Sequence, residues 1–263
     1  MAESGDPFLR IRGVHKSYPA PGGRTDALNG VDLDIARGDF LSIVGPSGCG
    51  KSTLLNIAAG IDGNFDGTAT FEGAPITGMA RERAVVFQEP ALFPWLNVRA
   101  NVEFGLKLRG MPKADRKPVV DQQLELVNLT RFDRAYIHEL SGGMKQRVQL
   151  ARALAVEPHM LMMDEPFAAL DAQTRDDLQL ELQGVAGRIG ATVLFVTHNV
   201  REAVILGDRV VVMSKSPGRI RRVIDIPLSR PRTPDDHDVA DFAAMVRSEL
   251  QEASSDVEPR YAI

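Results

Sequence analysis

The sequence has few of the features that mark a secreted, membrane-spanning or nucleic-acid-binding chain. Its 263 residues include one cysteine, Cys49, which excludes an internal disulfide framework and suits a reducing compartment. No apolar run approaches the roughly 18–20 residues that cross a bilayer, and the first ten residues lack the basic-then-apolar order of a secretory signal. The net charge of −4 provides no overall positive field for nucleic acid, and the five histidines show no spacing typical of zinc ligands.

Short apolar runs alternate with helical patterns along the chain. Continuous apolar runs, which suit strands buried on both faces of a parallel sheet, lie at residues 40–45, 84–88, 160–165 and 192–198. Residues 9–18 and 26–39 are expected to form strands with turns and residues 67–76 a hairpin, and residues 91–150 are mostly helical in pattern. This alternation predicts a parallel α/β core with an antiparallel β part at one side.

A glycine-rich stretch, GPSGCGKS at residues 45–52, matches the phosphate-loop pattern G-x-x-x-x-G-K-[ST] between a predicted strand and a predicted helix. Its glycines allow backbone N–H groups to curl around a phosphate, and the helix N-terminus adds a positive dipole end. Lys51 supplies a charge for the β- and γ-phosphates, and the Ser52 hydroxyl can ligate Mg²⁺. Cys49 is interpreted as a tolerated small residue of this loop.

Two acids, Asp164 and Glu165, end the predicted strand MLMMDE. An acid at that position can hold Mg²⁺ through water, and the next one can orient or deprotonate an attacking water. Together with the loop around Lys51, the pair predicts a nucleoside triphosphatase.

The start of a predicted helix at Ser141 narrows the class of nucleoside triphosphatase. Ser141 is a natural N-cap, and Gly142 and Gly143 allow backbone N–H groups to approach an anion. The string LSGGMKQR resembles, almost letter for letter, the signature of ATP-binding cassette (ABC) proteins. Further segments resemble that family in the expected order over about residues 8–226: Tyr18 the adenine-stacking aromatic, Gln88 the Q-loop, AALD at 168–171 the D-loop, and His198 the switch histidine.

The resemblance implies the fold class: α/β, a P-loop NTPase with a RecA-like parallel sheet core, an antiparallel β subdomain and an inserted helical subdomain. It predicts a cassette over residues 8–228, with the helical subdomain at about 91–150. A C-terminal linker and amphipathic helix are expected over residues 229–263.

The resemblance also implies site roles, with ATP and Mg²⁺ as the bound species. Glu165 is the general base, and Lys51 and His198 contact the γ-phosphate. Ser52, Gln88 and Asp164 serve the metal. The expected nucleotide-binding residues are Tyr18, Gly45, Pro46, Ser47, Gly48, Cys49, Gly50, Lys51, Ser52, Thr53, Gln88, Ser141, Gly142, Gly143 and Asp171. A head-to-tail dimer is implied, in which Ser141 and Gly143 of one copy close over ATP on the other.

A separate cassette of this size resembles the ATP-binding subunit of an importer, peripheral on the cytoplasmic face of the cell membrane. Its partners would be integral permease subunits, docked near Phe93, Pro94 and Trp95 beside the Q-loop, and indirectly an external binding protein. The stretches LFPWLNVRANVEFGL and MDEPFAALDAQTR most resemble the nitrate/sulfonate/taurine group, and related groups take bicarbonate, aromatic acids or thiamine precursors.

Two alternatives stay open at this stage. One is a soluble ABC ATPase acting on DNA or ribosomes, which the acidic charge and the lack of a coiled coil or second cassette disfavour. The other is a module that holds ATP without hydrolysing it, which the presence of Glu165 and His198 disfavours. The Phe93–Trp95 segment could also simply pack the helical insertion.

Overall fold

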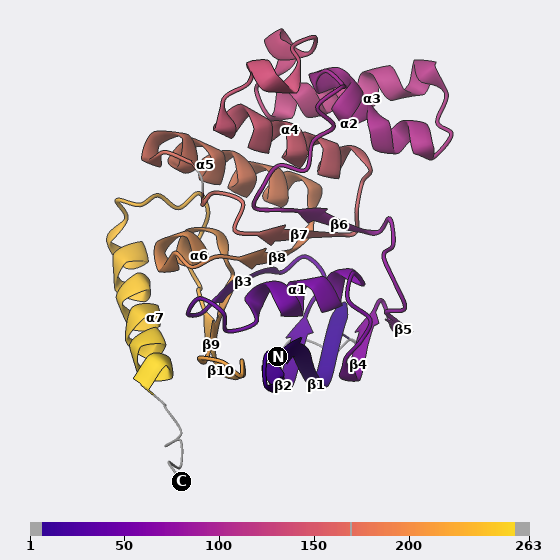
Figure 1. Cartoon of the computed structure of the whole chain (residues 1–263). Coiled ribbons are helices and arrows are strands. Elements are labelled where there is room, and N and C mark those ends of the chain that lie inside the picture. Colours follow the sequence, from indigo (N-terminus) through magenta and orange to yellow (C-terminus); the bar gives the residue numbers. More distant parts are fainter. Residues whose placement is uncertain (1–6, 169, 256–263) are drawn as a thin grey trace. The chain divides into compact units, whose positions relative to one another are not determined.

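The computed structural model describes residues 7–168 and 170–255, and its elements are labelled in Figure 1. Residue 169 of the predicted D-loop, residues 1–6 and residues 256–263 of the predicted C-terminal segment lie outside this description. The chain divides into two compact units. The first contains residues 1–80 and 192–263, and the second contains residues 81–191.

An antiparallel sheet occupies part of the first unit. Its strands are β1 (Leu9–Ala20), β2 (Gly23–Ile35), β4 (Asp66–Phe71) and β5 (Ala74–Pro75), in the order β2-β1-β4-β5. All of its pairings are antiparallel, and β4 and β5 form the expected hairpin. The β part predicted from the pattern is therefore confirmed.

The rest of the first unit is built on strands β3 (Phe40–Val44), β8 (Thr192–Val196), β9 (Arg209–Met213) and β10 (Ile220–Asp225). β3 pairs in parallel with β8 and with β9, and β10 pairs antiparallel with β9. Every residue of β3 and β8 is buried, which explains their unbroken apolar runs. Helices α1 (Lys51–Ala59) and α6 (Val200–Leu206) follow β3 and β8.

The second unit combines a parallel strand pair with a group of helices. β6 (Arg83–Val86) pairs in parallel with β7 (Met160–Asp164). The helices are α2 (Val98–Leu108), α3 (Lys113–Leu126), α4 (Gly142–Ala155) and α5 (Ala172–Ile189), with 3-10 turns η1 (Thr130–Phe132) and η2 (Ile137–Glu139). α4 packs against α2, α3 and α5, and it also contacts β6. The region between β6 and β7 is therefore helical, as its pattern indicates.

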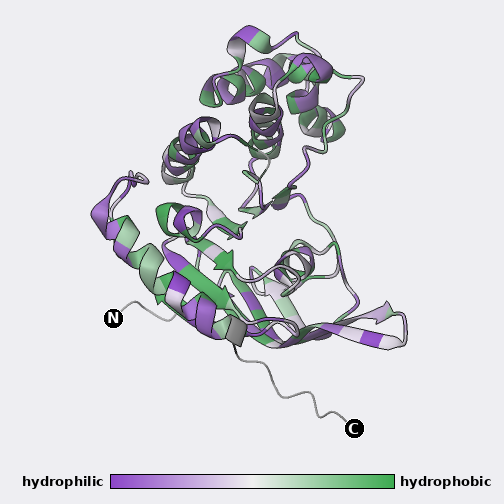
Figure 2. Cartoon of the chain, turned by 60° about the vertical axis from the view of Figure 1, so that its left-hand side comes forward, coloured by the Kyte–Doolittle hydropathy of each residue, from purple (hydrophilic) through white to green (hydrophobic). Residues whose placement is uncertain are grey.

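The C-terminal helix α7 (His237–Ser255) packs on α6, β9 and β10. Its buried side chains recur at helical spacing: Val239, Ala243, Val246 and Ala253. Figure 2 shows hydrophilic and hydrophobic residues alternating along it. Ion pairs from Arg221 and Arg222 of β10 reach Glu249. In the described part of the chain, no helix has both the length and the apolar character needed to span a membrane.

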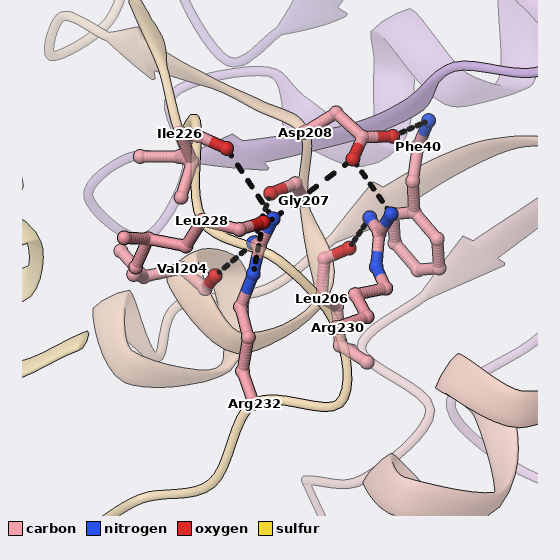
Figure 3. Close-up of polar contacts among 9 residues, drawn as sticks. All are labelled: Phe40, Val204, Leu206, Gly207, Asp208, Ile226, Leu228, Arg230 and Arg232. Carbon is pink, nitrogen blue, oxygen red and sulfur yellow. Dashed lines mark hydrogen bonds and ion pairs between the residues drawn. The ribbon is translucent and has the colours of Figure 1, made fainter. Parts of the chain in front are cut away.

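The predicted linker before α7 is held by a buried arginine. Arg232 is 2% exposed and donates hydrogen bonds to the carbonyl groups of Val204, Gly207, Ile226 and Leu228 (Figure 3). The first two carbonyls belong to the end of α6, where helix carbonyls lack partners within the helix. Burial lowers the pKa of Arg232 to about 10, so the guanidinium stays charged at neutral pH. This segment is therefore a buried clamp on α6.

Candidate functional site

The phosphate loop lies between β3 and α1 as the sequence predicts. Gly48 and Gly50 have φ angles of 76° and 93°, which side-chain-bearing residues rarely adopt. Gly50 is the N-cap of α1, so the first backbone N–H groups of the helix have no carbonyl partner within it. Lys51 is 6% exposed, and its Nζ donates to the carbonyls of Gly45 and Pro46 at 2.9 and 3.1 Å. The loop can therefore bind an anion through backbone N–H groups and one buried cation.

Two segments of the same unit, at Ala27 and at Gly218, pack closely against the loop. A Cβ atom added to Gly50 would lie 2.7 Å from the Ala27 carbonyl oxygen, and one added to Gly218 would lie 1.9 Å from the Cys49 carbonyl oxygen. Cys49 is 1% exposed, and burial raises the pKa of its thiol. These contacts leave the loop little room to move on its inner side. Cys49 therefore packs the loop from within and presents only its backbone to a ligand.

Tyr18, on β1, is 39% exposed and lies beside the loop's helix. Its Oη atom is 3.5 Å from Thr53 Oγ1 and 3.2 Å from Asp62 Oδ2. An exposed aromatic ring next to a phosphate loop can stack on a purine base. The structure thus places Tyr18 beside the phosphate-loop helix, and it adds Asp62, which sequence reasoning missed.

His198 follows β8 and is exposed in a tightly held turn. The residues on either side of it are fixed: Thr197 Oγ1 donates to Glu202 at 2.6 Å, and the Asn199 side chain accepts hydrogen bonds from the first N–H groups of α6. Asn199 stands where aspartate is common in the family, and it supplies the same N-cap. These hydrogen bonds therefore fix the backbone on both sides of the His198 imidazole.

In the second unit, Asp164 ends β7 and Glu165 follows it with a φ of 45°. This left-handed conformation is strained for a glutamate, and such strain concentrates at functional positions.

The signature segment and the D-loop each provide the N-cap residue of a helix in this unit. Ser141 caps α4 by accepting from the Met144 N–H, and Asp171 caps α5 by accepting from the N–H and hydroxyl of Thr174. Those two hydrogen bonds lower the pKa of Asp171. A Cβ added to Gly143 would lie 2.4 Å from Thr174 Cγ2, so glycine permits α4 and α5 to approach closely at the signature. The contact therefore joins the signature helix to the first turn of α5, 31 residues further along the chain.

A groove of about 290 Å³ in the second unit is lined by residues of β6, α2 and α4 and by Phe93. Gln88 is exposed, and its carbonyl accepts from Gln146 at 2.8 Å. Phe93 packs on Phe104 with ring centroids 4.3 Å apart, and the Arg152 guanidinium lies 5.5 Å from the Phe93 ring centroid. The groove lining includes Ala84, Val85, Phe93, Phe104, Arg152 and Val156. The lining is mostly apolar, with Arg152 and Gln149 as its polar side chains.

Trp95 and Phe93 differ in their surroundings. Trp95 is 71% exposed, whereas Phe93 is half-buried and Pro94 is exposed. The alternative that this segment only packs the helical insertion thus describes Phe93 in part and does not describe Trp95. A large apolar side chain left in solvent beside an apolar groove is typical of an interaction surface.

The oxygen donors named for a metal suit Mg²⁺ by their chemistry. Ser52 offers a hydroxyl, Gln88 an amide oxygen and Asp164 a carboxylate, and hard cations such as Mg²⁺ prefer oxygen ligands. Within the described residues, no group of three or more His, Cys, Asp or Glu side chains could hold a metal by itself.

Comparisons with known proteins agree with the motifs. The ABC transporter family model matches residues 28–168. An uncharacterized ABC transporter ATP-binding protein of Methanocaldococcus jannaschii is 47% identical over 85% of this chain and 84% of its own. A taurine import ATP-binding protein of Roseobacter denitrificans is 45% identical over 84% and 83%. A nitrate import ATP-binding protein of Synechocystis is 45% identical over 86% of this chain and 34% of its own.

Solved structures agree as well. A dimeric ATP-binding cassette in a post-hydrolysis state, bound to ADP and Pi, superposes with a TM-score of 0.74 at 31% identity. The match covers 84% of this chain and all of that one. The predicted fold class, a P-loop α/β cassette with a β part and a helical part, is therefore confirmed.

Proposed function

The chain belongs to the ABC transporter family and is an ATP-binding, ATP-hydrolysing cassette, and we propose that it powers the import of a small oxyanionic or sulfonated nutrient. The phosphate loop is the main support for ATP hydrolysis. Lys51 is buried there, and Gly50 begins helix α1. The chain also has Glu165 and His198. The import of taurine and of nitrate by relatives supports the cargo class.

Each protein group has a distinct part in the reaction. The backbone N–H groups of the loop and Lys51 bind the phosphates, and Tyr18 stacks on the adenine. Glu165 accepts a proton from the attacking water, and His198 hydrogen-bonds the γ-phosphate as charge moves to its oxygens. Ser52, Gln88 and Asp164 would hold Mg²⁺, which neutralises phosphate charge when bound.

The cassette acts as a head-to-tail dimer on an integral permease. Ser141 and Gly143 of one copy close over ATP on the phosphate loop of the other, as the dimeric relative bound to ADP and Pi supports. The groove that contains Phe93 and Arg152 takes a short cytoplasmic helix of the permease, with Trp95 at its rim. This docking holds the chain at the cytoplasmic face of the membrane, and an external binding protein delivers the cargo.

The hydrolytic part is tested with Glu165→Gln in the purified full-length chain. This variant should bind ATP with the affinity of the parent, lose at least about 100-fold in turnover, and run as a dimer when ATP is present. Lys51→Ala should lose ATP binding and turnover together. Turnover near that of the parent in Glu165→Gln would contradict its role as the base.

The cargo is tested by growth of the source cell without this gene on single nitrogen or sulfur sources: nitrate, taurine, simple alkanesulfonates and sulfate. We expect failure on one of them, restored by the intact gene but not by Glu165→Gln. Growth on all of them, with uptake of each labelled compound unchanged, would contradict the proposed cargo class and leave the ATPase assignment standing.

A further inference from the structure

A buried lysine lies against the ring that the proposed function assigns to adenine. Lys16 and Tyr18 are two residues apart on β1, and a shift in the pairing register with β2 lies between them. Both side chains reach Asp62. Lys16 is 7% exposed, and its Nζ atom lies 4.8 Å from the centroid of the Tyr18 ring. That distance is within the range of a cation–π interaction, whose strength increases when the cation is desolvated.

The ammonium group is fixed in place by acceptors from another segment. Lys16 Nζ donates to Asp62 at 2.8 Å and to the Asn64 carbonyl, and Asp62 also accepts from the Asn64 N–H at 3.0 Å. Burial raises the pKa of Asp62, but the hydrogen bonds from Lys16 and Asn64 outweigh it and keep the pKa below its usual value. The Asp62 carboxylate is therefore ionised at neutral pH.

The same carboxylate reaches the tyrosine. Tyr18 Oη donates to Asp62 Oδ2 at 3.2 Å and lies 3.5 Å from Thr53 Oγ1 of α1. One end of the ring is thus tied to the phosphate-loop helix, while a cation supports its face. A side chain that is 39% exposed would otherwise sample several rotamers.

We propose that Lys16 and Asp62 are positioning residues for the nucleotide: they hold the Tyr18 ring in place, and the Lys16 ammonium strengthens its stacking on adenine. This inference rests on the proposed role of Tyr18. A cation at one face draws π density from the ring, which favours an electron-rich purine on the exposed side. The effect acts on the base and not on the phosphates.

The central test uses Lys16→Met, which keeps the length of the side chain and removes its charge. In the full-length chain, the KM for ATP should rise about fivefold while kcat stays within about twofold. The inhibition constant of tripolyphosphate, which has phosphates but no base, should not change. Equal weakening of ATP and tripolyphosphate would show a damaged loop and overturn the proposal, as would an unchanged KM.

A double-mutant cycle separates positioning from general structural support. Tyr18→Ala should raise KM about tenfold, because stacking on the base is lost. Adding Lys16→Met to Tyr18→Ala should have no further effect, since the lysine acts through the ring. If the two changes multiply, Lys16 acts by another route and the proposal fails.

Two more variants complete the design. Asp62→Asn leaves Lys16 its backbone acceptor and should raise KM at least twofold, which tests the proposal even if Lys16→Met does not fold. Arg209→Met removes another ion pair of the first unit, with Asp39 at the far end of β9 from the loop, and should leave KM unchanged. If Lys51→Ala abolishes turnover but Lys16→Met and Asp62→Asn leave KM alone, this inference fails while the proposed function stands.

Discussion

At the scale of single residues, backbone geometry identifies unusual positions independently of chemistry. Among the described residues, four that are not glycine have a positive φ: Glu72, Asn128, Glu157 and Glu165. Such a conformation costs roughly 1–2 kcal/mol. Glu72 lies in the β4–β5 turn, whereas Glu165 follows a buried strand directly. Its strain therefore coincides with the residue proposed as the general base.

Gly143 offers a sharp test of the contact between the signature and the D-loop. Gly143→Ala should destabilise the chain by about 1–3 kcal/mol, because its new methyl group meets Thr174 Cγ2. Thr174→Ser removes that methyl group but keeps the hydroxyl that bonds Asp171, so the double variant should regain most of the loss. The free energy of unfolding in urea measures all three.

Gly142→Ala is the matched control, since a Cβ atom there meets nothing within 4 Å. It should leave the free energy of unfolding unchanged or slightly raised. A loss in Gly142→Ala as large as that in Gly143→Ala would show that the contact with Thr174 does not decide the effect.

Single residues also mark the limit of sequence reasoning about the site. Lys16 and Tyr18 both lie on a predicted strand, but the register shift after Lys16 breaks the alternation of faces, so spacing alone does not place the ammonium over the ring. Asp62 is 44 residues from Tyr18 and follows α1 in a turn, so no local pattern connects them. Contacts between distant segments depend on the fold and leave no signal in spacing.

At the scale of elements, the end of α6 depends on a side chain that comes after β10. Arg232→Met should lower the free energy of unfolding by about 3 kcal/mol, because several buried carbonyl groups lose a charged donor. Thermal unfolding monitored by circular dichroism measures the loss. Arg247→Met, an exposed position on α7, should change stability by less than about 0.5 kcal/mol.

Elements marked by continuous apolar runs or by helical periodicity were predicted well, and the clamp on α6 was not. The strands at 40–45 and 192–198 are the buried β3 and β8, and the expected C-terminal helix is α7. Residues 229–236 have the polar, proline-marked composition of a linker, yet Arg232 is buried among backbone carbonyls there. Charged residues are almost never buried without partners, and composition does not show where partners lie.

At the scale of the whole molecule, the proposed docking on a permease depends on surface side chains. Trp95→Ala should lower the amount of the chain recovered with membranes that contain its permease by at least about threefold, because buried aromatic anchors dominate interface energies. ATP hydrolysis by the isolated chain should not change. Leu108→Ala is the control, since Leu108 is 74% exposed on the same unit but outside the groove. Equal losses in both variants would contradict docking at the groove.

The burial of Cys49 makes the native chain a reporter of its own local opening. It is the sole thiol in 263 residues, it is 1% exposed within the phosphate loop, and burial raises its pKa. A thiol reagent can therefore react only when the loop opens, so the labelling rate measures the free energy of that opening at one known position. Nucleotide contacts that hold the loop closed would slow the labelling, which makes ligand binding visible without an added probe.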